Sequence, residues 1–340
     1  MKTAIVLFNL GGPDGPEAVE PFLRNLFSDP AILRVPGFLR GFLARLISRR
    51  RAPVAKALYD KIGGGSPLLP NTQAQARALE GALKDLGEVR CFIAMRYWHP
   101  FADETARGVK SFAPDRIMLL PLYPQYSTTT TESSFGDWNR AAAKAGLTAR
   151  TFTIRDYPAN PGFVAAVARL TGELLPQARA AGPTKVLFSA HGLPKKIVQA
   201  GDPYADQVGT SVRAVVAKLG LALEDYEICF QSRVGPLEWI RPYTDEEIRR
   251  AAEEGKSILL VPIAFVSEHS ETLVELDIEY RHLAETRGAR GYFRVPAVGT
   301  APEFIAGLAE MVRQGLRNGG PPASSPSNSS SSTASLEKRS

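Results

Sequence analysis

Three glutamates spaced four residues apart follow a strongly apolar stretch of the sequence. Residues 258–265 are typical of a buried strand, and the chain turns polar just after it, at His269. Glu271, Glu275 and Glu279 come next, and their spacing places them on one side of a helix. Like charges at that spacing repel by roughly a few tenths of a kcal/mol per pair unless a cation or a proton resolves them. Open α/β sheets bind ligands at the carboxyl ends of their strands, so we expect a metal- or proton-handling edge rather than a solvated acidic face.

A second candidate for proton chemistry is His191, in the sequence LFSAHGLPKK of residues 187–196. It follows another strand-like run, and its small or flexible neighbours leave the imidazole accessible. An imidazole ordinarily titrates near neutral pH and therefore suits a proton acceptor. A histidine at the end of a strand is as often a satisfied turn residue, and the residues alone leave both interpretations open.

Three further stretches offer binding surfaces. The glycine-rich residues 62–70, IGGGSPLLP, present backbone N–H groups to an anion or simply turn the chain before a helix. Trp239, in QSRVGPLEW of residues 231–239, either stacks on a flat aromatic ligand or simply packs against the surface of the protein. Residues 36–51 place two phenylalanines and other apolar side chains on one helical face and arginines on the other. That pattern favours the lip of an apolar pocket, or contact with a membrane surface, over a core-facing helix.

Composition limits the class of protein. The chain has 340 residues, 44% of them apolar and 22% charged, with a net charge of +6, which is a globular composition with room for two domains. No run is long enough to span a bilayer, and the N-terminus is typical of a first strand rather than a signal peptide. The two cysteines, Cys91 and Cys229, lie in apolar runs, which favours a reducing compartment without a disulfide framework or a cysteine-held iron–sulfur cluster. Nucleic-acid motifs and phosphate-loop patterns are missing, so we expect neither nucleic acid nor nucleotide as a partner.

Strand-like runs alternate with helix-length amphipathic segments, which predicts βαβ units and parallel sheets. Several motifs also recur in the same order, such as VLFNLGG at 6–12 and VLFSAHG at 186–192, which suggests two similar halves facing one cleft. We expect residues 1–125, with a C-terminal helix at about 300–318, to form one half and residues 126–299 the other. Residues 319–340 are rich in serine and proline and predict a disordered tail. The predicted strands are 4–9, 90–96, 116–123, 151–155, 185–190, 226–231 and 257–265, and the clearest amphipathic segments are 70–86, 161–181 and 205–219.

Taken together, these motifs resemble the ferrochelatase family, whose members are lyases that insert ferrous iron into protoporphyrin IX to form protohaem. The resemblance covers about residues 4 to 315 and rests on IGGGSP, LYPQYS, SAHGLP with GDPY, QSRVGP and VPIAFVSEHSETLVELDIEY in this order. It implies an α/β fold of two Rossmann-like domains, each a parallel four-stranded sheet flanked by helices, with the active-site cleft between them. It also implies Fe²⁺ as a substrate without a required cofactor, and a cytoplasmic protein that touches the inner-membrane surface through segment 33–51.

Matched position by position, the resemblance implies that His191 and Glu271 face each other across the porphyrin as the catalytic and metal-handling pair. Whether His191 accepts pyrrole protons or binds the metal stays open, as does the order in which it and Glu271 act. His269 would support the pair, and Glu275 and Glu279 would form a polar path for protons or iron. Tyr123 and Arg96 would lie on the opposite wall, where metal delivery is expected. The substrate-binding residues would be Arg51, Tyr59, Ser66, Trp239 and Leu10.

The chain departs from the family pattern in two places. Many relatives carry a cysteine-ligated [2Fe–2S] cluster near the C-terminus, but no cysteine follows Cys229 here, so we predict no cluster. Glu268 stands where relatives often have aspartate, a conservative change. The alternative activities are insertion of iron into coproporphyrin, insertion of cobalt or nickel into another tetrapyrrole, and a non-catalytic porphyrin or haem carrier. The apolar face at residues 38–47 favours protoporphyrin, because a more polar ring would need more cationic contacts.

Overall fold

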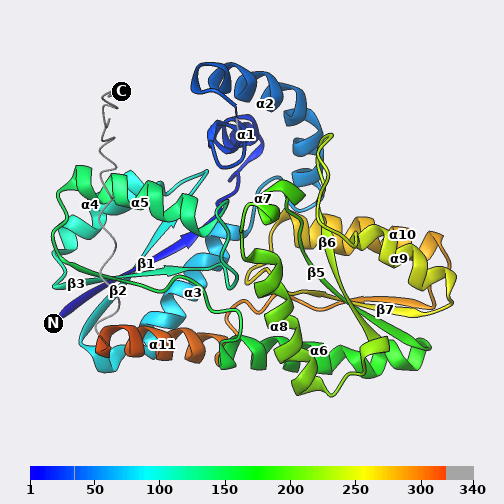
Figure 1. Cartoon of the computed structure of the whole chain (residues 1–340). Coiled ribbons are helices and arrows are strands. Elements are labelled where there is room, and N and C mark those ends of the chain that lie inside the picture. Colours follow the sequence, from blue (N-terminus) through cyan, green and yellow to red (C-terminus); the bar gives the residue numbers. More distant parts are fainter. Residues whose placement is uncertain (34, 319–340) are drawn as a thin grey trace, which may run out of the picture.

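The computed structural model describes residues 1–33 and 35–318, so the predicted tail lies outside the described residues. Within these residues the strands form two four-stranded parallel sheets that lie side by side (Figure 1), with the orders β2-β1-β3-β4 and β6-β5-β7-β8. This arrangement confirms the predicted pair of Rossmann-like halves, and the strand order is the same in both. The first sheet contains β1 (Lys2–Asn9), β2 (Glu88–Met95), β3 (Arg116–Pro121) and β4 (Arg150–Thr153), and the second contains β5 (Thr184–His191), β6 (Tyr226–Gln231), β7 (Ser257–Pro262) and β8 (Gly291–Arg294).

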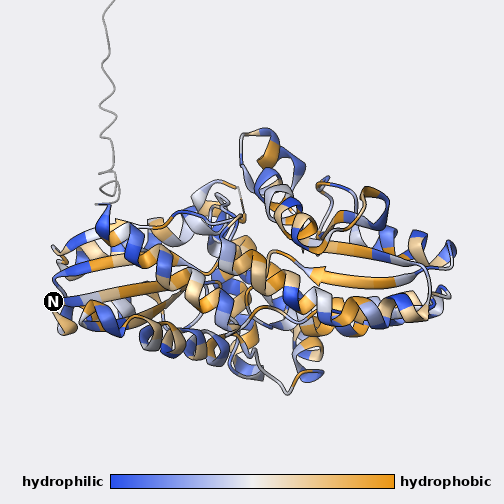
Figure 2. Ribbon diagram, turned by 90° about the horizontal axis from the view of Figure 1, so that it is seen from below, coloured by the Kyte–Doolittle hydropathy of each residue, from blue (hydrophilic) through white to orange (hydrophobic). Residues whose placement is uncertain are grey.

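The central strands are apolar because helices cover both of their faces. All six residues of β7 are buried, as are seven of the eight in β1. Figure 2 shows the same contrast, with apolar strands inside helices of mixed hydropathy. The helices are α1 (Val19–Ser28), α2 (Gly37–Asp60), α3 (Leu68–Ala82), α4 (Ala102–Phe112), α5 (Thr131–Ala145), α6 (Pro161–Ala181), α7 (Lys195–Gln199), α8 (Tyr204–Leu219), α9 (Thr244–Glu253), α10 (Tyr280–Thr286) and α11 (Pro302–Arg317), with 3-10 turns at Pro16–Ala18, Lys84–Leu86 and Leu223–Asp225.

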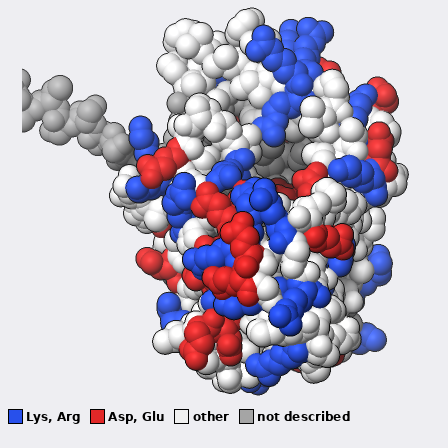
Figure 3. Space-filling model, turned by 90° about the vertical axis from the view of Figure 1, so that its right-hand side faces the viewer, with Lys and Arg blue, Asp and Glu red and all other residues white. Residues whose placement is uncertain are grey.

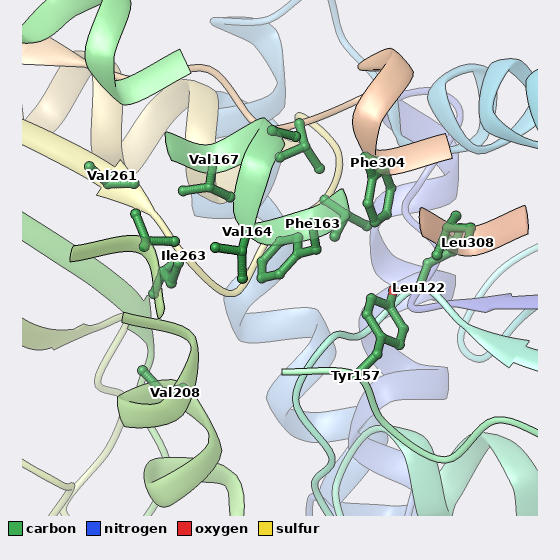
Figure 4. Close-up of a cluster of buried hydrophobic side chains, with 14 of the residues drawn as sticks. Leu122, Tyr157, Phe163, Val164, Val167, Val208, Val261, Ile263, Phe304 and Leu308 are labelled. Carbon is green, nitrogen blue, oxygen red and sulfur yellow. The ribbon is translucent and has the colours of Figure 1, made fainter. Parts of the chain in front are cut away.

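One hydrophobic core joins the two halves. Leu122, which follows β3, belongs to the same buried cluster as Ile263, which follows β7. Phe163 of α6 and Phe304 of α11 lie in this cluster with their rings 6.2 Å apart (Figure 4). The helix α11 packs against α3 of the first half and α6 of the second. The halves are therefore packed together rather than joined by a linker alone.

The predicted boundary at residue 125 falls too early. Strand β4 pairs in parallel with β3, from Arg116 opposite Arg150 to Leu119 opposite Thr153, so β4 belongs to the first sheet. The helix α5 packs against α4 and β1 and belongs to the same half. The chain then crosses to the second half through α6. The Asn160 side chain caps that helix by accepting hydrogen bonds from the N–H groups of residues 162 and 163, each at 3.0 Å. The pattern of β4 identifies a strand but not the sheet that it joins, because the partner strand is distant in the sequence.

The helix α2 buries its small side chains and exposes its large apolar ones. Ala44, Ser48 and Ala52 are buried, whereas Phe38 is 83% exposed and Phe42 is 69% exposed. Small residues let α2 approach its partner α1 closely, and the phenylalanines point away from the protein. A core-facing helix would show the opposite arrangement, so the apolar face is available for a ligand or another surface.

The glutamate-bearing segment is a π-helix, Glu271–Glu279, rather than the α-helix that the four-residue spacing suggests. The Tyr280 N–H donates to the carbonyl of Glu275, five residues earlier, and the regular helix α10 begins at that point. Short π-helical turns are uncommon and frequently occur at functional sites. The segment follows β7 and lies at the carboxyl end of the second sheet.

Candidate active site

Neighbouring elements of the second half bring three predicted site residues together. His191 is the last residue of β5, and β5 pairs with β7, whose continuation leads to His269 and Glu271. The Nε2 atom of His191 lies 3.7 Å from Oε1 of Glu271, and Nε2 of His269 lies 3.3 Å from Oε2 of the same carboxylate. The side chains of His191 and Glu271 are 36% and 29% exposed, so the pair is accessible to a ligand.

The hydrogen bonds of His191 define its tautomer. Its Nδ1 atom lies 2.6 Å from the carbonyl oxygen of Gly192. A carbonyl oxygen can only accept a hydrogen bond, so Nδ1 carries the hydrogen. In the neutral imidazole the lone pair therefore resides on Nε2, the atom that faces Glu271. This geometry leaves His191 ready to accept a proton at Nε2.

The two histidines keep Glu271 ionised. Burial alone raises the pKa of this carboxyl group, but the charge of His191 and the hydrogen bond and charge of His269 outweigh burial and lower it from 4.5 to about 2. Glu271 is consequently a fixed anion beside the histidines. It stabilises an imidazolium when one forms and offers oxygen atoms to a hard cation.

The next glutamate has the opposite environment. Burial, aided by the charge of Glu271, raises the pKa of Glu275 above its ordinary value, although hydrogen bonds from Ser232 and Tyr280 oppose the rise. Oε1 of Glu275 accepts from the Ser232 N–H at 2.9 Å and from the Tyr280 hydroxyl at 3.0 Å. Oε2 accepts from the Ser232 hydroxyl and from Gln231 Nε2 at 3.2 Å. Two carboxyl groups whose pKa values are driven apart are a common arrangement for moving protons.

The glutamate series ends at a cavity and a lysine. Glu275 and Glu279 both line a cavity of about 330 Å³. Lys61, at the end of α2, forms an ion pair with Glu279, with Nζ and Oε1 3.4 Å apart. The three carboxylates therefore run from the half-buried Glu271 to the exposed Glu279, which is paired with a lysine. Their role as a path for protons or iron stays a prediction. The expected repulsion between these carboxylates is relieved in three ways: two histidines lie beside Glu271, the pKa of Glu275 is raised, and Lys61 pairs with Glu279.

The first half supplies Arg96 and Tyr123. The guanidinium of Arg96 donates from Nε to Ser133 Oγ at 2.7 Å and forms a 2.8 Å ion pair with the buried Asp29. Asp29 also accepts from the Tyr97 hydroxyl at 2.8 Å. The hydroxyl of Tyr123 is buried and has no hydrogen-bond partner within the described chain. Arg96 therefore anchors the segment before α2, and its role in metal delivery stays a prediction.

The predicted substrate-binding residues occupy two regions. Trp239 lies beside His191, with the two ring centroids 6.2 Å apart and the rings tilted at 52°. Tyr59, near the end of α2, packs with Leu10, and its hydroxyl accepts a 3.5 Å hydrogen bond from Ser270, directly before Glu271. Burial raises the pKa of Tyr59 to about 12, so the phenol stays protonated at neutral pH.

Arg51 and Ser66 complete the predicted set. Arg51 is exposed on α2, with its guanidinium 5.8 Å from the ring centroid of Phe27. Ser66 packs so closely on Gly12 that a Cβ at Gly12 would lie 2.5 Å from the serine hydroxyl. Glycine at position 12 is what allows the glycine-rich turn to approach the end of β1.

Sequence reasoning missed several residues that hold this site. Ser232 is one of them, because its backbone φ of +63° aims its N–H at Glu275. Lys61 and Asp29 were also missed, since their partners lie far away in the sequence. Each is an ordinary polar residue in a loop or at a helix end, so its own position carries no signal. Within the described residues no group of three or more histidine, cysteine or acidic side chains is arranged to hold a metal ion.

The fold is that of a chelatase. The sirohydrochlorin chelatase SirB from Bacillus subtilis, solved with Fe³⁺, superimposes with a TM-score of 0.53 over 94% of this chain and 97% of that chain, at 14% identity. DR2241 from Deinococcus radiodurans, described as structurally similar to chelatases, gives a TM-score of 0.52 over 92% of this chain and 54% of that chain, at 17% identity. At these identities the likeness concerns the fold alone.

The chain belongs to the ferrochelatase family. The Ferrochelatase family model matches residues 2–316. The ferrochelatase of Caulobacter vibrioides is 56% identical over 93% of this chain and 90% of that protein, and the ferrochelatase of Phenylobacterium zucineum is 56% identical over 94% and 93%. The ferrochelatase of Pelagibacter ubique is 50% identical over 92% and 91%. These matches confirm the predicted family and make the chain a metal-insertion enzyme of haem biosynthesis.

Proposed function

We propose that the chain inserts ferrous iron into protoporphyrin IX at His191 and Glu271. In this reaction two pyrrole N–H protons leave the ring, Fe²⁺ takes their place, and protohaem and two protons are the products. The observation that carries the assignment is the pair itself. A neutral His191 has its lone pair on Nε2, and that atom lies 3.7 Å from Oε1 of Glu271. Once His191 is protonated, its charge and His269 together hold the pKa of Glu271 at about 2. This is a proton acceptor with a fixed counter-charge beside it.

His191 accepts a pyrrole proton in this proposal, and Glu271 stabilises the imidazolium that results. Protons then leave through Glu275, whose raised pKa suits transient protonation, towards Glu279 and the cavity. His269 keeps Glu271 oriented from its other oxygen. Iron is the second substrate, and the oxygen and nitrogen atoms of His191 and Glu271 are its expected contacts. A site with few ligands suits iron that must be passed on to the porphyrin.

The porphyrin would lie between Trp239 and the apolar residues under α2, near Leu10. Trp239 offers a flat apolar face beside His191. The propionates need donors, which Arg51, Tyr59 and Ser66 supply, and a protonated Tyr59 phenol is suited to this task. Tyr123 and Arg96 would form the opposite wall on the first half.

We also propose that α2 contacts a membrane surface from the cytoplasmic side. Phe38 and Phe42 are its most exposed apolar side chains, and Figure 3 shows basic side chains over α2 above a hollow. An apolar face bordered by arginines suits an interfacial helix at an anionic bilayer. Among the described residues, no helix has both the length and the apolar character needed to cross a bilayer. Replacing Phe38 and Phe42 with serine should abolish co-sedimentation with anionic vesicles while leaving turnover in detergent; unchanged sedimentation would exclude this contact.

The role of His191 is tested by His191→Ala beside the matched control His282→Ala. His282 is exposed on α10 and outside the site. Anaerobic loss of porphyrin fluorescence on addition of Fe²⁺ should persist in the control and vanish in His191→Ala, while both variants still bind protoporphyrin. Turnover by His191→Ala at the rate of the control would overturn the assignment. Binding without metal insertion by the wild type would instead favour coproporphyrin, another metal, or a carrier.

A further inference from the structure

Arg294 connects two parts of the chain that lie on either side of Glu271. It is the last residue of β8, and its side chain is 10% exposed. Its NH1 atom donates to Oε1 of Glu268 at 2.8 Å, and its Nε lies 3.2 Å from Oδ2 of Asp277. Glu268 directly precedes His269, and Asp277 lies within the π-helix. One buried guanidinium therefore holds both the loop that enters the helix and the helix itself.

Further contacts support the same loop. The Glu268 carboxylate also accepts from the N–H of Ala297 at 2.9 Å, and its backbone carbonyl accepts from Asn71 at 3.0 Å. These bonds leave little freedom for the backbone immediately before His269. The position of Glu268 is thus determined from three directions, one of which is Arg294.

Strand β8 also contacts the far end of the π-helix. The Tyr292 hydroxyl donates to the carbonyl oxygen of Leu276, and the Tyr292 carbonyl accepts from Arg281 at 2.8 Å. The contacts from β8 therefore lie at the junction where five-residue hydrogen bonds give way to α10. A regular α-helix has fewer residues per turn than a π-helix, so converting this segment would rotate Asp277 away from Arg294. The Arg294 contacts fit the π-helical register.

We propose that Arg294 is a positioning residue that sets the register of the π-helix and thereby the placement of Glu271 against His191. Arg294 does not touch the reacting atoms and acts through Glu268 and Asp277. The inference rests on the proposed function, because the consequence for catalysis follows only if Glu271 acts in the reaction. Planar guanidinium groups suit this task, since one group can pair with two carboxylates, here through a hydrogen bond to Glu268 and an ion pair with Asp277.

The test compares Arg294→Met with Arg281→Met. Arg281 pairs with the same Asp277, with NH2 and Oδ1 2.7 Å apart, but has no contact with Glu268. Residues that orient catalytic ligands commonly affect activity by about 10- to 100-fold. We expect Arg294→Met to lower kcat by that factor with the protoporphyrin KM within about two-fold, and Arg281→Met to change kcat by less than about three-fold. Lysine at 294 should recover part of the lost kcat because it retains the charge.

Hydrogen exchange of peptides covering residues 268–280 gives a readout that does not depend on turnover. Exchange there should accelerate more in Arg294→Met than in Arg281→Met, because only Arg294 also holds Glu268, with the first sheet unchanged. Glu268→Gln retains the shape of the side chain and replaces Arg294→Met in the test if that variant does not fold. It should also lower kcat. Unchanged exchange and kcat in either variant, or equal losses in Arg281→Met, would overturn the proposal. A wild type without turnover would refute the proposed function, whereas exchange would still test the role of Arg294 in the register.

Discussion

Replacing Glu271 with glutamine removes the fixed charge beside His191 while preserving the shape of the side chain. The fall of the Glu271 pKa from 4.5 to about 2 corresponds to about 3 kcal/mol of attraction to the two imidazolium groups, net of burial. That attraction becomes available to the reaction when His191 takes up a proton. If His191 accounts for at least half of it, Glu271→Gln should lower kcat by about 10- to 100-fold. The effect should fall on kcat, because Glu271 stabilises a charge that forms during the reaction.

The assay is steady-state turnover with Fe²⁺ and protoporphyrin under anaerobic conditions, beside Glu285→Gln. Glu285 is exposed on α10 and supplies the same chemical change outside the site. The protoporphyrin KM of Glu271→Gln should stay within about two-fold of the wild-type value. A kcat within about three-fold of the control, or a loss that appears entirely in KM, would refute the electrostatic reasoning.

Three further predictions concern the surroundings of the pair. The raised pKa of Glu275 means that its charged form destabilises the fold, a cost that grows as pH rises through and above the ordinary range of a glutamate. Glu275→Gln should therefore gain free energy of unfolding relative to the wild type between pH 4 and pH 8 in urea titrations, and a constant difference would contradict this. Gly12→Ala places a Cβ 2.5 Å from the Ser66 hydroxyl, so it should lower the free energy of unfolding by about 1–3 kcal/mol and raise the protoporphyrin KM. Gly81→Ala, whose Cβ would meet nothing within 4 Å, should change neither quantity. Purified protein should contain no acid-labile sulfide, since Cys91 and Cys229 are the chain's two cysteines and lie on strands of different sheets; stoichiometric sulfide would overturn the prediction of no cluster.

The strands and the positions of the main site residues could be predicted from the sequence. The apolar runs of β1, β5 and β7 are strong local signals; His191 is the last residue of β5, and Glu271 begins the helix that follows the loop after β7. Parallel strands carry such residues to one edge of a sheet, so proximity follows from topology. The helix α6 has the bounds of the amphipathic segment predicted at residues 161–181, and a proline and a capping asparagine stand at its start.

Features that depend on distant partners were not predictable in the same way. The choice between an α-helix and a π-helix at Glu271 depends on contacts from β8, a four-residue strand too short to stand out in the sequence. The different pKa shifts of Glu271 and Glu275 depend on which side chains surround each, and the spacing suggests two equivalent groups. The ion pair between Lys61 and Glu279 joins residues that are 218 positions apart in the sequence. In each case the missing information is tertiary.

The most direct test of the central claim is a competition between protoporphyrin IX and coproporphyrin III for Fe²⁺ insertion by the wild-type protein. Both porphyrins would be supplied together under anaerobic conditions in detergent, and the two haem products would be separated and counted. The exposed phenylalanines of α2 and the few cationic side chains among the predicted substrate contacts lead us to expect protohaem as the main product. Predominant coprohaem would contradict the choice of substrate, and the absence of both haems despite porphyrin binding would contradict the assignment of iron insertion to this site.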